Sequence, residues 1–327
     1  LYTNKTYNKV LIIYDSNIES SYIQTIHSIS SRYISSVEKI SLDVNNNIKS
    51  IDSYKNICEY LIKNNYTRDS LIISCGGGSI GDLSGFVAST YYRGIDYIQI
   101  PSTLLSMVDS SVGGKTGIDS IYGKNLIGTF YHPVKVIIDT NLLSTLKLNE
   151  IHSGLFEVIK YSILFSNNFF SYLEDNINDT DKITNLTYII SECCRMKSNV
   201  VSNDERDNSQ RLKLNFGHTI GHAIESAYGL SHGESVGLGM KCAINISQEL
   251  GFIDPIKTKR IFKLINKLNL SKIQIDSDLI LKKLKKDKKM ENNQNTFILI
   301  KDIEHSFVYN KVGSDIIKMS IKNLWKY

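Results

Sequence analysis

The sequence is poor in cysteine, proline and tryptophan, and it lacks a long apolar segment. Its 327 residues include 5 cysteines, 3 prolines and 1 tryptophan. An odd number of cysteines cannot all pair within one chain, and none forms a CxxC pair, so we expect a reduced, cytoplasmic protein. No apolar stretch approaches the roughly 20 residues of a membrane-spanning helix, and residues 1–9 are too polar for a signal-peptide core.

Charge of neither sign is in large excess. The chain has 38 Lys and Arg against 33 Asp and Glu, a net charge of +5. This suits a small anionic ligand, whereas nucleic-acid binding usually needs a concentrated basic face. The lysine run at 282–289 has no interleaved aromatic residues, so we interpret it as a solvated helix face. At about 100–200 residues per domain, the length indicates two domains.

The first half of the chain contains four short apolar runs, at residues 10–14, 71–75, 97–100 and 134–138. Continuous apolar runs are typical of strands buried on both faces of a parallel sheet. The segments between them are long enough to cross over as helices. We therefore predict an α/β domain over residues 1–146.

Helical periodicity dominates the second half, which is nearly free of proline before residue 270. The predicted helices span 155–165, 183–201, 216–228 and 235–250, with Ser235 as a candidate cap and Gly229 and Gly251 as helix ends. One short strand is expected at 296–300. This predicts an α-helical domain over residues 147–327.

A glycine-rich turn follows the second apolar run. Gly76, Gly78 and Gly81 match GxGxxG between a predicted strand and a predicted helix. Glycines let the backbone approach a pyrophosphate, and a helix N-terminus supplies N–H donors and partial positive charge. The motif predicts a nucleotide or phosphate site; the alternative is an ordinary tight turn between a strand and a helix.

A second glycine turn precedes Lys115. It lacks the full P-loop spacing, because Asp109 stands where the first glycine would be. A turn of this kind can still present a lysine to an anion, and Lys124 and Asn125 follow another glycine, Gly123. The alternative is a pair of glycine-rich connections with solvated lysines.

Three of the 7 histidines lie within fifteen residues. His218 and His222 are four apart on one predicted helix face, and His232 follows shortly after. Such spacing is typical of zinc ligands, and Glu157 on another helix can add an oxygen ligand. The alternative is that these histidines are structural or exposed.

Taken together, these motifs are similar to those of the 3-dehydroquinate synthase family. The resemblance runs from about residue 10 to residue 300. It rests on residues 76–86, 92–95, 108–116, 123–125, 154–160 and 214–225, which occur in order and at the family's spacing.

The resemblance implies an N-terminal α/β nucleotide-binding domain and an all-α C-terminal domain. It also implies a lyase of the shikimate pathway that turns 3-deoxy-D-arabino-heptulosonate 7-phosphate (DAHP) into 3-dehydroquinate and phosphate. The implied cofactors are NAD, regenerated in each turnover, and a divalent metal, usually Zn²⁺ with Co²⁺ as an alternative. The implied partners are this small-molecule substrate and a second copy of the chain, with neither nucleic acid nor membrane.

The family's site residues carry over to matching positions of this sequence. The implied metal ligands are Glu157, His218 and His232. This set differs from the one that spacing alone favours, which pairs His218 with His222. His222 would support proton movement beside the metal. The residues that match the family's contacts to the substrate's hydroxyls and carboxylate are Asp109, Lys160, Lys197, Asn215 and Arg211. Those that match its phosphate site are Lys115, Asn125 and Lys288, joined by Arg93 of the neighbouring subunit of a homodimer. Those that match the NAD site are Asp15, Asn17, Lys55, Gly77, Gly78, Asp82, Ser102, Thr103, Lys115, Lys124 and Thr145.

The sequence departs from the family pattern in four places. Asp52 and Ser102 replace a glutamate and a threonine near the NAD site, and Lys147 replaces a proline. Residues 207–210 replace a segment usually rich in Glu and Gly, which predicts slower turnover. Three alternatives remain: another sugar phosphate cyclase, a related NAD- and metal-dependent polyol dehydrogenase, and a binding module without activity. The candidate carboxylate and phosphate ligands favour the synthase over the other two enzymes.

Overall fold

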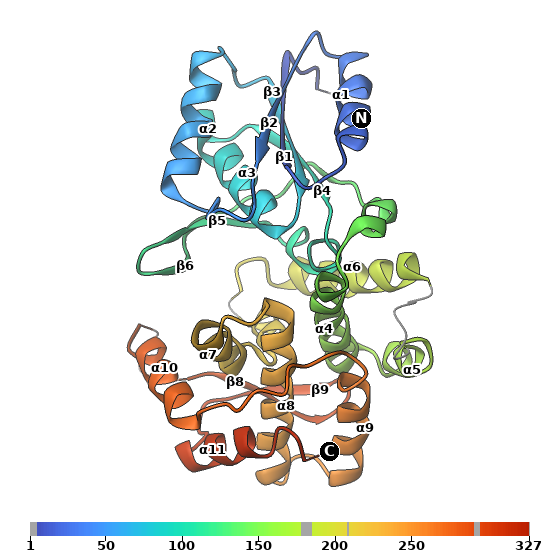
Figure 1. Cartoon of the computed structure of the whole chain (residues 1–327), viewed down its shortest axis with the longest axis vertical. Coiled ribbons are helices and arrows are strands. Elements are labelled where there is room, and N and C mark those ends of the chain that lie inside the picture. Colours follow the sequence, from blue (N-terminus) through green and yellow to red (C-terminus); the bar gives the residue numbers. More distant parts are fainter. Residues whose placement is uncertain (1–4, 178–184, 208, 291–294, 327) are drawn as a thin grey trace. The chain divides into compact units, whose positions relative to one another are not determined.

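The computed structural model describes residues 5–177, 185–207, 209–290 and 295–326. For residues 286–290 it describes the backbone alone. The chain divides into two compact units, Leu1–Leu146 and Lys147–Tyr327 (Figure 1). Within the described residues, none of the helices combines the length and apolarity that crossing a membrane requires.

The first unit is built on a five-stranded parallel sheet with the order β2-β1-β3-β4-β7. The strands predicted at residues 10–14, 71–75 and 97–100 are confirmed. At the fourth run, 134–138, only Lys135 and Val136 form a strand, and neither residue is buried. The elements are β1 (Lys9–Asp15), α1 (Ser20–Ser31), β2 (Ser36–Leu42), α2 (Ile51–Lys63), β3 (Ser70–Gly76), α3 (Gly78–Thr90), η1 (Tyr91–Arg93), β4 (Asp96–Pro101), η2 (Ser106–Ser110), β5 (Lys115–Ser120), β6 (Gly123–Phe130), β7 (Lys135–Val136) and η3 (Thr140–Thr145).

The three central strands of the sheet, β1, β3 and β4, are buried on both faces, as their continuous apolar runs require. Alternate residues of β1 point to opposite sides: Leu11 packs with α2 and α3, and Val10 with α1. Figure 1 shows α1 on one side of the sheet and α2 with α3 on the other. Because every residue of β3 is buried, the strand holds the glycine turn that follows it in a fixed position.

The second unit is mainly helical and includes one antiparallel β-hairpin. The predicted strand at 296–300 is confirmed, and a second strand pairs with it. The elements are α4 (Leu148–Phe165), α5 (Asn167–Asn176), α6 (Leu186–Asn203), η4 (Gln210–Asn215), α7 (His218–Tyr228), α8 (His232–Glu249), α9 (Pro255–Ile265), α10 (Ser277–Met290), β8 (Phe297–Asp302), β9 (His305–Tyr309) and α11 (Ser314–Lys322).

Helix α8 is the core of this unit and packs against α4, α7, α11 and β8. The prediction that Ser235 caps it was wrong. Ser231 is the cap, because its side chain accepts a hydrogen bond from the backbone N–H of Glu234, and Ser235 is buried one turn inside the helix. The helix therefore begins at His232. The predicted helix ends at Gly229 and Gly251 are confirmed by their left-handed backbone, with φ of 67° and 74°.

Candidate functional site

The second unit brings Glu157, His218 and His232 together. One ligand atom from each lies within 4.8 Å of the others. The Nε2 atoms of His218 and His232 are 3.7 and 3.6 Å from Oε1 of Glu157, whose side chain is fully buried. The three residues come from α7, α8 and α4, so the cluster depends on helix packing rather than on sequence spacing. Two imidazoles and a carboxylate are a common donor set for catalytic zinc.

Both histidines are held with Nε2 toward the carboxylate. Nδ1 of His218 lies 3.2 Å from the carbonyl oxygen of Phe216, and Nδ1 of His232 lies 3.1 Å from Oε2 of Glu225. A carbonyl or carboxylate oxygen can only accept, so each Nδ1 carries the proton and donates it. In its neutral form each ring then presents a lone pair at Nε2. Metal-binding histidines are typically oriented by such contacts, and these residues therefore fit a divalent cation.

The charged surroundings act on the two imidazoles in opposite directions. Burial, together with the nearby Lys160 ammonium, lowers the pKa of His218 to about 3. Burial also lowers the pKa of His232, but hydrogen bonds to Glu157 and Glu225 outweigh it and raise this pKa to about 9. At pH 7 His218 is therefore neutral, the form that binds a metal, whereas His232 is protonated in the metal-free protein and must release its Nε2 proton when a metal binds.

Two glycines on α8 allow the helices to come close enough for this cluster. A Cβ atom on Gly233 would lie 2.1 Å from the carbonyl oxygen of Ser153 on α4, and one on Gly239 would lie 1.9 Å from that of Gly217. The backbone N–H of Gly233 also donates to Oγ of Ser153. Any larger residue at either position would push α8 away from α4 or α7 and separate the three ligands.

His222 lies beside this cluster. Its ring centroid is 5.2 Å from that of His218 and 5.9 Å from that of His232. The side chain is exposed, and with Glu225 and His232 it forms a second group whose ligand atoms lie within 4.8 Å of one another. His222 can therefore exchange a proton with a group held near the cluster.

Three of the predicted substrate ligands in the second unit are buried cations. Lys160 forms an ion pair with Glu157 one helical turn away and is 1% exposed. Lys197 on α6 is buried, and Arg211 on η4 is 2% exposed, with Nη1 donating to the carbonyl of Glu205. Asn215, at the end of η4, is exposed. Charges this deeply buried are costly unless they are paired or meet an anion.

In the first unit, several of the predicted NAD-binding residues lie at the carboxyl ends of the parallel strands, where open α/β sheets bind their ligands. The predicted strand, glycine turn and helix are confirmed by β3 and α3. Gly77 caps α3 without a side-chain hydrogen bond, so the first N–H groups are available to an anion. A Cβ atom on Gly77 would lie 3.2 Å from Thr103, and one on Gly78 would lie 3.1 Å from Ser110.

Of the other predicted NAD-binding residues of this unit, some lie at the same edge of the sheet and others lie away from it. Asp15 ends β1 and accepts from the backbone N–H of Asn17, and Ser102 donates its backbone N–H to the carbonyl of Gly76 at the same edge. Thr145 ends η3. Lys55 projects from α2, where its exposed ammonium lies 3.7 Å from Glu59.

The second glycine turn leads into the β5–β6 hairpin rather than into a helix. Gly113 and Gly114 have φ of 109° and 65°, and β5 begins at Lys115. Lys124 and Asn125 lie on β6 and are exposed with Lys115. Asp109 lies on the π-helical turn η2, just before these glycines. The side chain of Lys288, on α10, lies outside the described residues.

Sequence reasoning missed Lys49, which precedes α2. Its ammonium is 2.7 Å from Oδ2 of Asp82 and contacts Oδ1 of Asn125. Neither motif spacing nor the resemblance singles out this lysine, because it lies between elements. It was also hidden because its partners are 33 and 76 positions away in the sequence.

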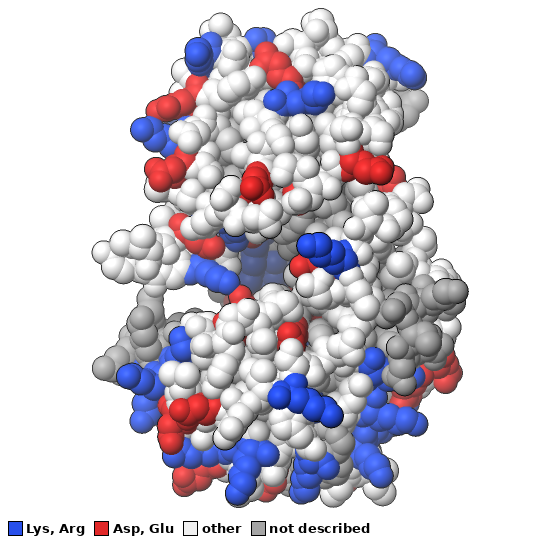
Figure 2. Space-filling view, viewed as in Figure 1, with Lys and Arg blue, Asp and Glu red and all other residues white. Residues whose placement is uncertain are grey.

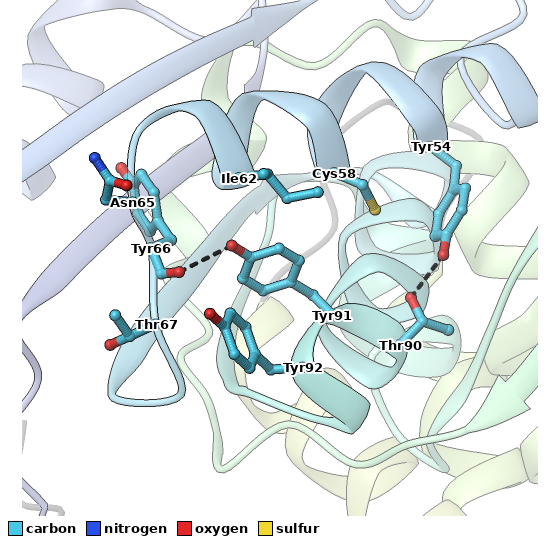
Figure 3. Close-up of a pocket in the computed structure, with 9 residues that line it drawn as sticks. All are labelled: Tyr54, Cys58, Ile62, Asn65, Tyr66, Thr67, Thr90, Tyr91 and Tyr92. Atoms are coloured by element: carbon cyan, nitrogen blue, oxygen red, sulfur yellow. Dashed lines mark hydrogen bonds between the residues drawn. The ribbon is translucent and has the colours of Figure 1, made fainter.

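Arg93 occupies a strained turn. Tyr92 and Arg93 have φ of 50° and 65°, in the left-handed region that residues with side chains rarely adopt. Arg93 is exposed. Beside it is a pocket of about 620 Å³, which Figure 3 shows between α2 and Tyr91 and Tyr92. The hydroxyl of Tyr91 donates to the carbonyl of Tyr66 across its wall. None of the predicted site residues is among those that line this pocket.

Comparison with solved structures identifies the kind of fold. The chain is similar to 2-deoxy-scyllo-inosose synthase in complex with carbaglucose-6-phosphate, NAD⁺ and Co²⁺, with a TM-score of 0.88, 25% identity and coverage of 98% of this chain and 92% of that one. It has the same fold as 2-epi-5-epi-valiolone synthase from Streptomyces hygroscopicus subsp. jinggangensis, which was solved with NAD⁺ and Zn²⁺ (TM-score 0.89, 21% identity, 98% and 92% coverage). The fold is thus that of the sugar phosphate cyclases.

Sequence comparison narrows this class to one family. The families described as 3-dehydroquinate synthase N-terminal and C-terminal match residues 39–153 and 154–290. The 3-dehydroquinate synthase of Clostridium perfringens (strain 13 / Type A) is 46% identical over 279 residues, which cover 84% of this chain and 80% of that protein. The chain belongs to the 3-dehydroquinate synthase family.

Proposed function

We propose that this chain is a carbon–oxygen lyase that converts DAHP into 3-dehydroquinate and phosphate, a step of the shikimate pathway toward chorismate and aromatic amino acids. The observation that carries the proposal is the cluster of Glu157, His218 and His232, with both histidines already oriented through Nδ1, in a chain of this family. In this proposal the first unit binds NAD, and the second binds the metal and much of the substrate.

The three clustered residues would hold one divalent metal. Zinc is our first choice because two histidines and a carboxylate suit it, with Co²⁺ as the alternative. When bound, the metal would supply a Lewis acid that polarises a substrate hydroxyl. His222, exposed beside the ligands, would take and return protons there. The ammonium of Lys160, held by Glu157, would position a substrate oxygen.

The glycine turn at the start of α3 would hold the pyrophosphate of NAD. Its support is the uncapped N-terminus at Gly77 and the close packing of Gly78. NAD would supply reversible hydride transfer, so that no net oxidation occurs. The remaining residues proposed for NAD are Asp15, Asn17, Lys55, Asp82, Ser102, Thr103, Lys115, Lys124 and Thr145.

The substrate's two anionic ends would be bound by different residues. We assign its carboxylate to Lys197 and Arg211, since both are buried cations and a guanidinium can bind two carboxylate oxygens. Asn215 and Asp109 would contact hydroxyls. Its phosphate is assigned to Lys115, Asn125 and Lys288. The basic and acidic residues are otherwise interspersed on the face drawn in Figure 2, which favours a small anion over a polyanion.

A homodimer completes the proposal. Arg93 is exposed on a strained turn, and strain of this kind persists mainly where a side chain serves a function. We propose that Arg93 reaches the phosphate bound by the partner subunit. A cytoplasmic location is proposed because none of the five cysteines, all of them among the described residues, forms a disulfide.

The test compares three substrates with the purified protein, NAD and Zn²⁺. The proposal predicts phosphate release and dehydroquinate from DAHP, and little turnover of a heptulose 7-phosphate that lacks the carboxylate. Faster turnover of the latter would make the chain another sugar phosphate cyclase. NADH accumulating from a simple polyol would make it a dehydrogenase, and binding of DAHP without release of phosphate would leave a binding module.

A further inference from the structure

Lys49 connects the two parts of the first unit that are proposed to bind NAD and phosphate. Its side chain is 12% exposed, and its ammonium forms an ion pair of 2.7 Å with Asp82, one turn into α3. The same ammonium donates to the amide oxygen of Asn125 on β6. One cation therefore joins the helix that follows the glycine turn to the hairpin.

The backbone reinforces this connection. The carbonyl oxygen of Lys49 accepts from the backbone N–H of Asp119, at 2.7 Å. Oδ1 of Asp119 in turn accepts from the backbone N–H of Asn125, at 2.8 Å. Asn125 has φ of 57°, and these contacts hold it in that left-handed conformation. Both the main chain and the side chain of Lys49 thus fix the position of Asn125.

The direction of the amide follows from the chemistry of the donor. An ammonium can only donate, so the atom of Asn125 that it contacts must be the amide oxygen. The amide NH₂ group, with its two N–H donors, then faces away from Lys49. Donors of this kind suit the oxygens of a phosphate group. Without Lys49 the amide could turn its oxygen toward the phosphate, which would repel it.

We propose that Lys49 is a positioning residue of the phosphate site, which acts by fixing the amide of Asn125 with its N–H groups outward. This inference rests on the proposed function, which assigns Asn125 to the phosphate. The ion pair with Asp82 holds the ammonium in place and ties the hairpin to α3. Neither the motifs nor the matched family positions assign a role to Lys49.

The test uses inorganic phosphate as the probe, as a competitive inhibitor of DAHP turnover by the 327-residue chain with NAD and Zn²⁺. Lys49→Met should raise the inhibition constant of phosphate and the KM of DAHP about tenfold, with a smaller change in kcat. Lys49→Arg should restore much of the loss because it keeps a donor and a charge. Lys63→Met is the matched control, since this exposed lysine ends α2 and should change neither constant.

A double-mutant cycle separates positioning from direct contact. In an Asn125→Ala background, Lys49→Met should cause no further loss of phosphate affinity, because the group on which it acts is gone. An equal loss in both backgrounds would overturn the proposal, since Lys49 would then act independently of Asn125. The proposal would also be overturned if Lys49→Met left the inhibition constant of phosphate and the KM of DAHP unchanged, even if the variant melted at a lower temperature. A parent protein that phosphate does not inhibit would refute the proposed phosphate site and this inference with it.

Discussion

Removing Glu225 should weaken metal binding although Glu225 is not one of the proposed ligands. Its Oε2 lies 3.1 Å from Nδ1 of His232 and fixes the form of the ring that presents Nε2 to the metal. Loss of such an orienting partner typically costs 10–100-fold in metal affinity. At 1.4 kcal/mol per factor of ten, this corresponds to about 1.4–2.8 kcal/mol. Glu225→Leu should show this loss in full, and Glu225→Gln a smaller one, because an amide oxygen can still accept from Nδ1.

The assay is a titration of the metal-free protein with Zn²⁺ in competition with a chromophoric chelator, repeated with Co²⁺. Glu234→Gln is the control: this carboxylate lies on α8, the helix of His232, but accepts from the backbone N–H of Ser271, at 2.6 Å. It should leave the affinity unchanged. His222→Ala should also keep the metal while it loses rate, whereas His232→Ala should lose the metal. Equal affinity in the parent and in a folded Glu225→Leu variant would refute the orienting role.

Three further predictions concern the substrate, the assembly and the stability of the second unit. Arg211→Leu should weaken DAHP binding about 10–150-fold and leave NAD binding unchanged in calorimetry, since it removes a charge-assisted pair of roughly 1.5–3 kcal/mol; equal DAHP binding would remove Arg211 from the site. Arg93→Ala and Lys115→Ala should each be nearly inactive, but exchange of subunits between the two variants should restore about a quarter of the parent activity. About half of the dimers then become mixed, and each mixed dimer has one intact site. No recovery in verified mixed dimers would refute a phosphate site shared between subunits. Burial lowers the pKa of Lys241 to about 8, so the unfolded chain binds more protons than the folded one between about pH 8 and 10.5, and this lysine makes stability rise with pH across that window. Lys241→Met should remove that rise and increase the free energy of unfolding at pH 7 by at most about 3 kcal/mol, reduced by the loss of the contact between the ammonium and the Trp325 ring at 4.6 Å. Urea unfolding followed by the fluorescence of Trp325 measures this change, and an unchanged pH dependence would contradict the lowered pKa.

The parts of the fold that were predicted are those that local pattern determines. The strands β1, β3 and β4 are continuous apolar runs because both faces of the sheet are covered. Strand β2 was missed because it is only half-buried, so it carries no such run. The hairpin β5–β6 was missed for a related reason: β6 is largely exposed and contains polar and glycine residues.

The candidate site shows the same division. Spacing on one helix pairs His218 with His222, but His232 reaches the cluster through the close contact of Gly233 with Ser153 on α4, which sequence spacing does not encode. The family resemblance supplied this third ligand. Neither source could supply Lys49, whose contacts depend on how separate elements fold against one another.

The most direct test of the central claim counts product against NAD. The protein is incubated with saturating DAHP, Zn²⁺ and one equivalent of NAD per chain, and absorbance at the NADH band is followed together with phosphate and dehydroquinate. We predict many equivalents of both products per NAD, formed in equal amounts, with no accumulation of NADH. A reaction that stops after one equivalent, or that produces NADH in proportion to product, would contradict this prediction.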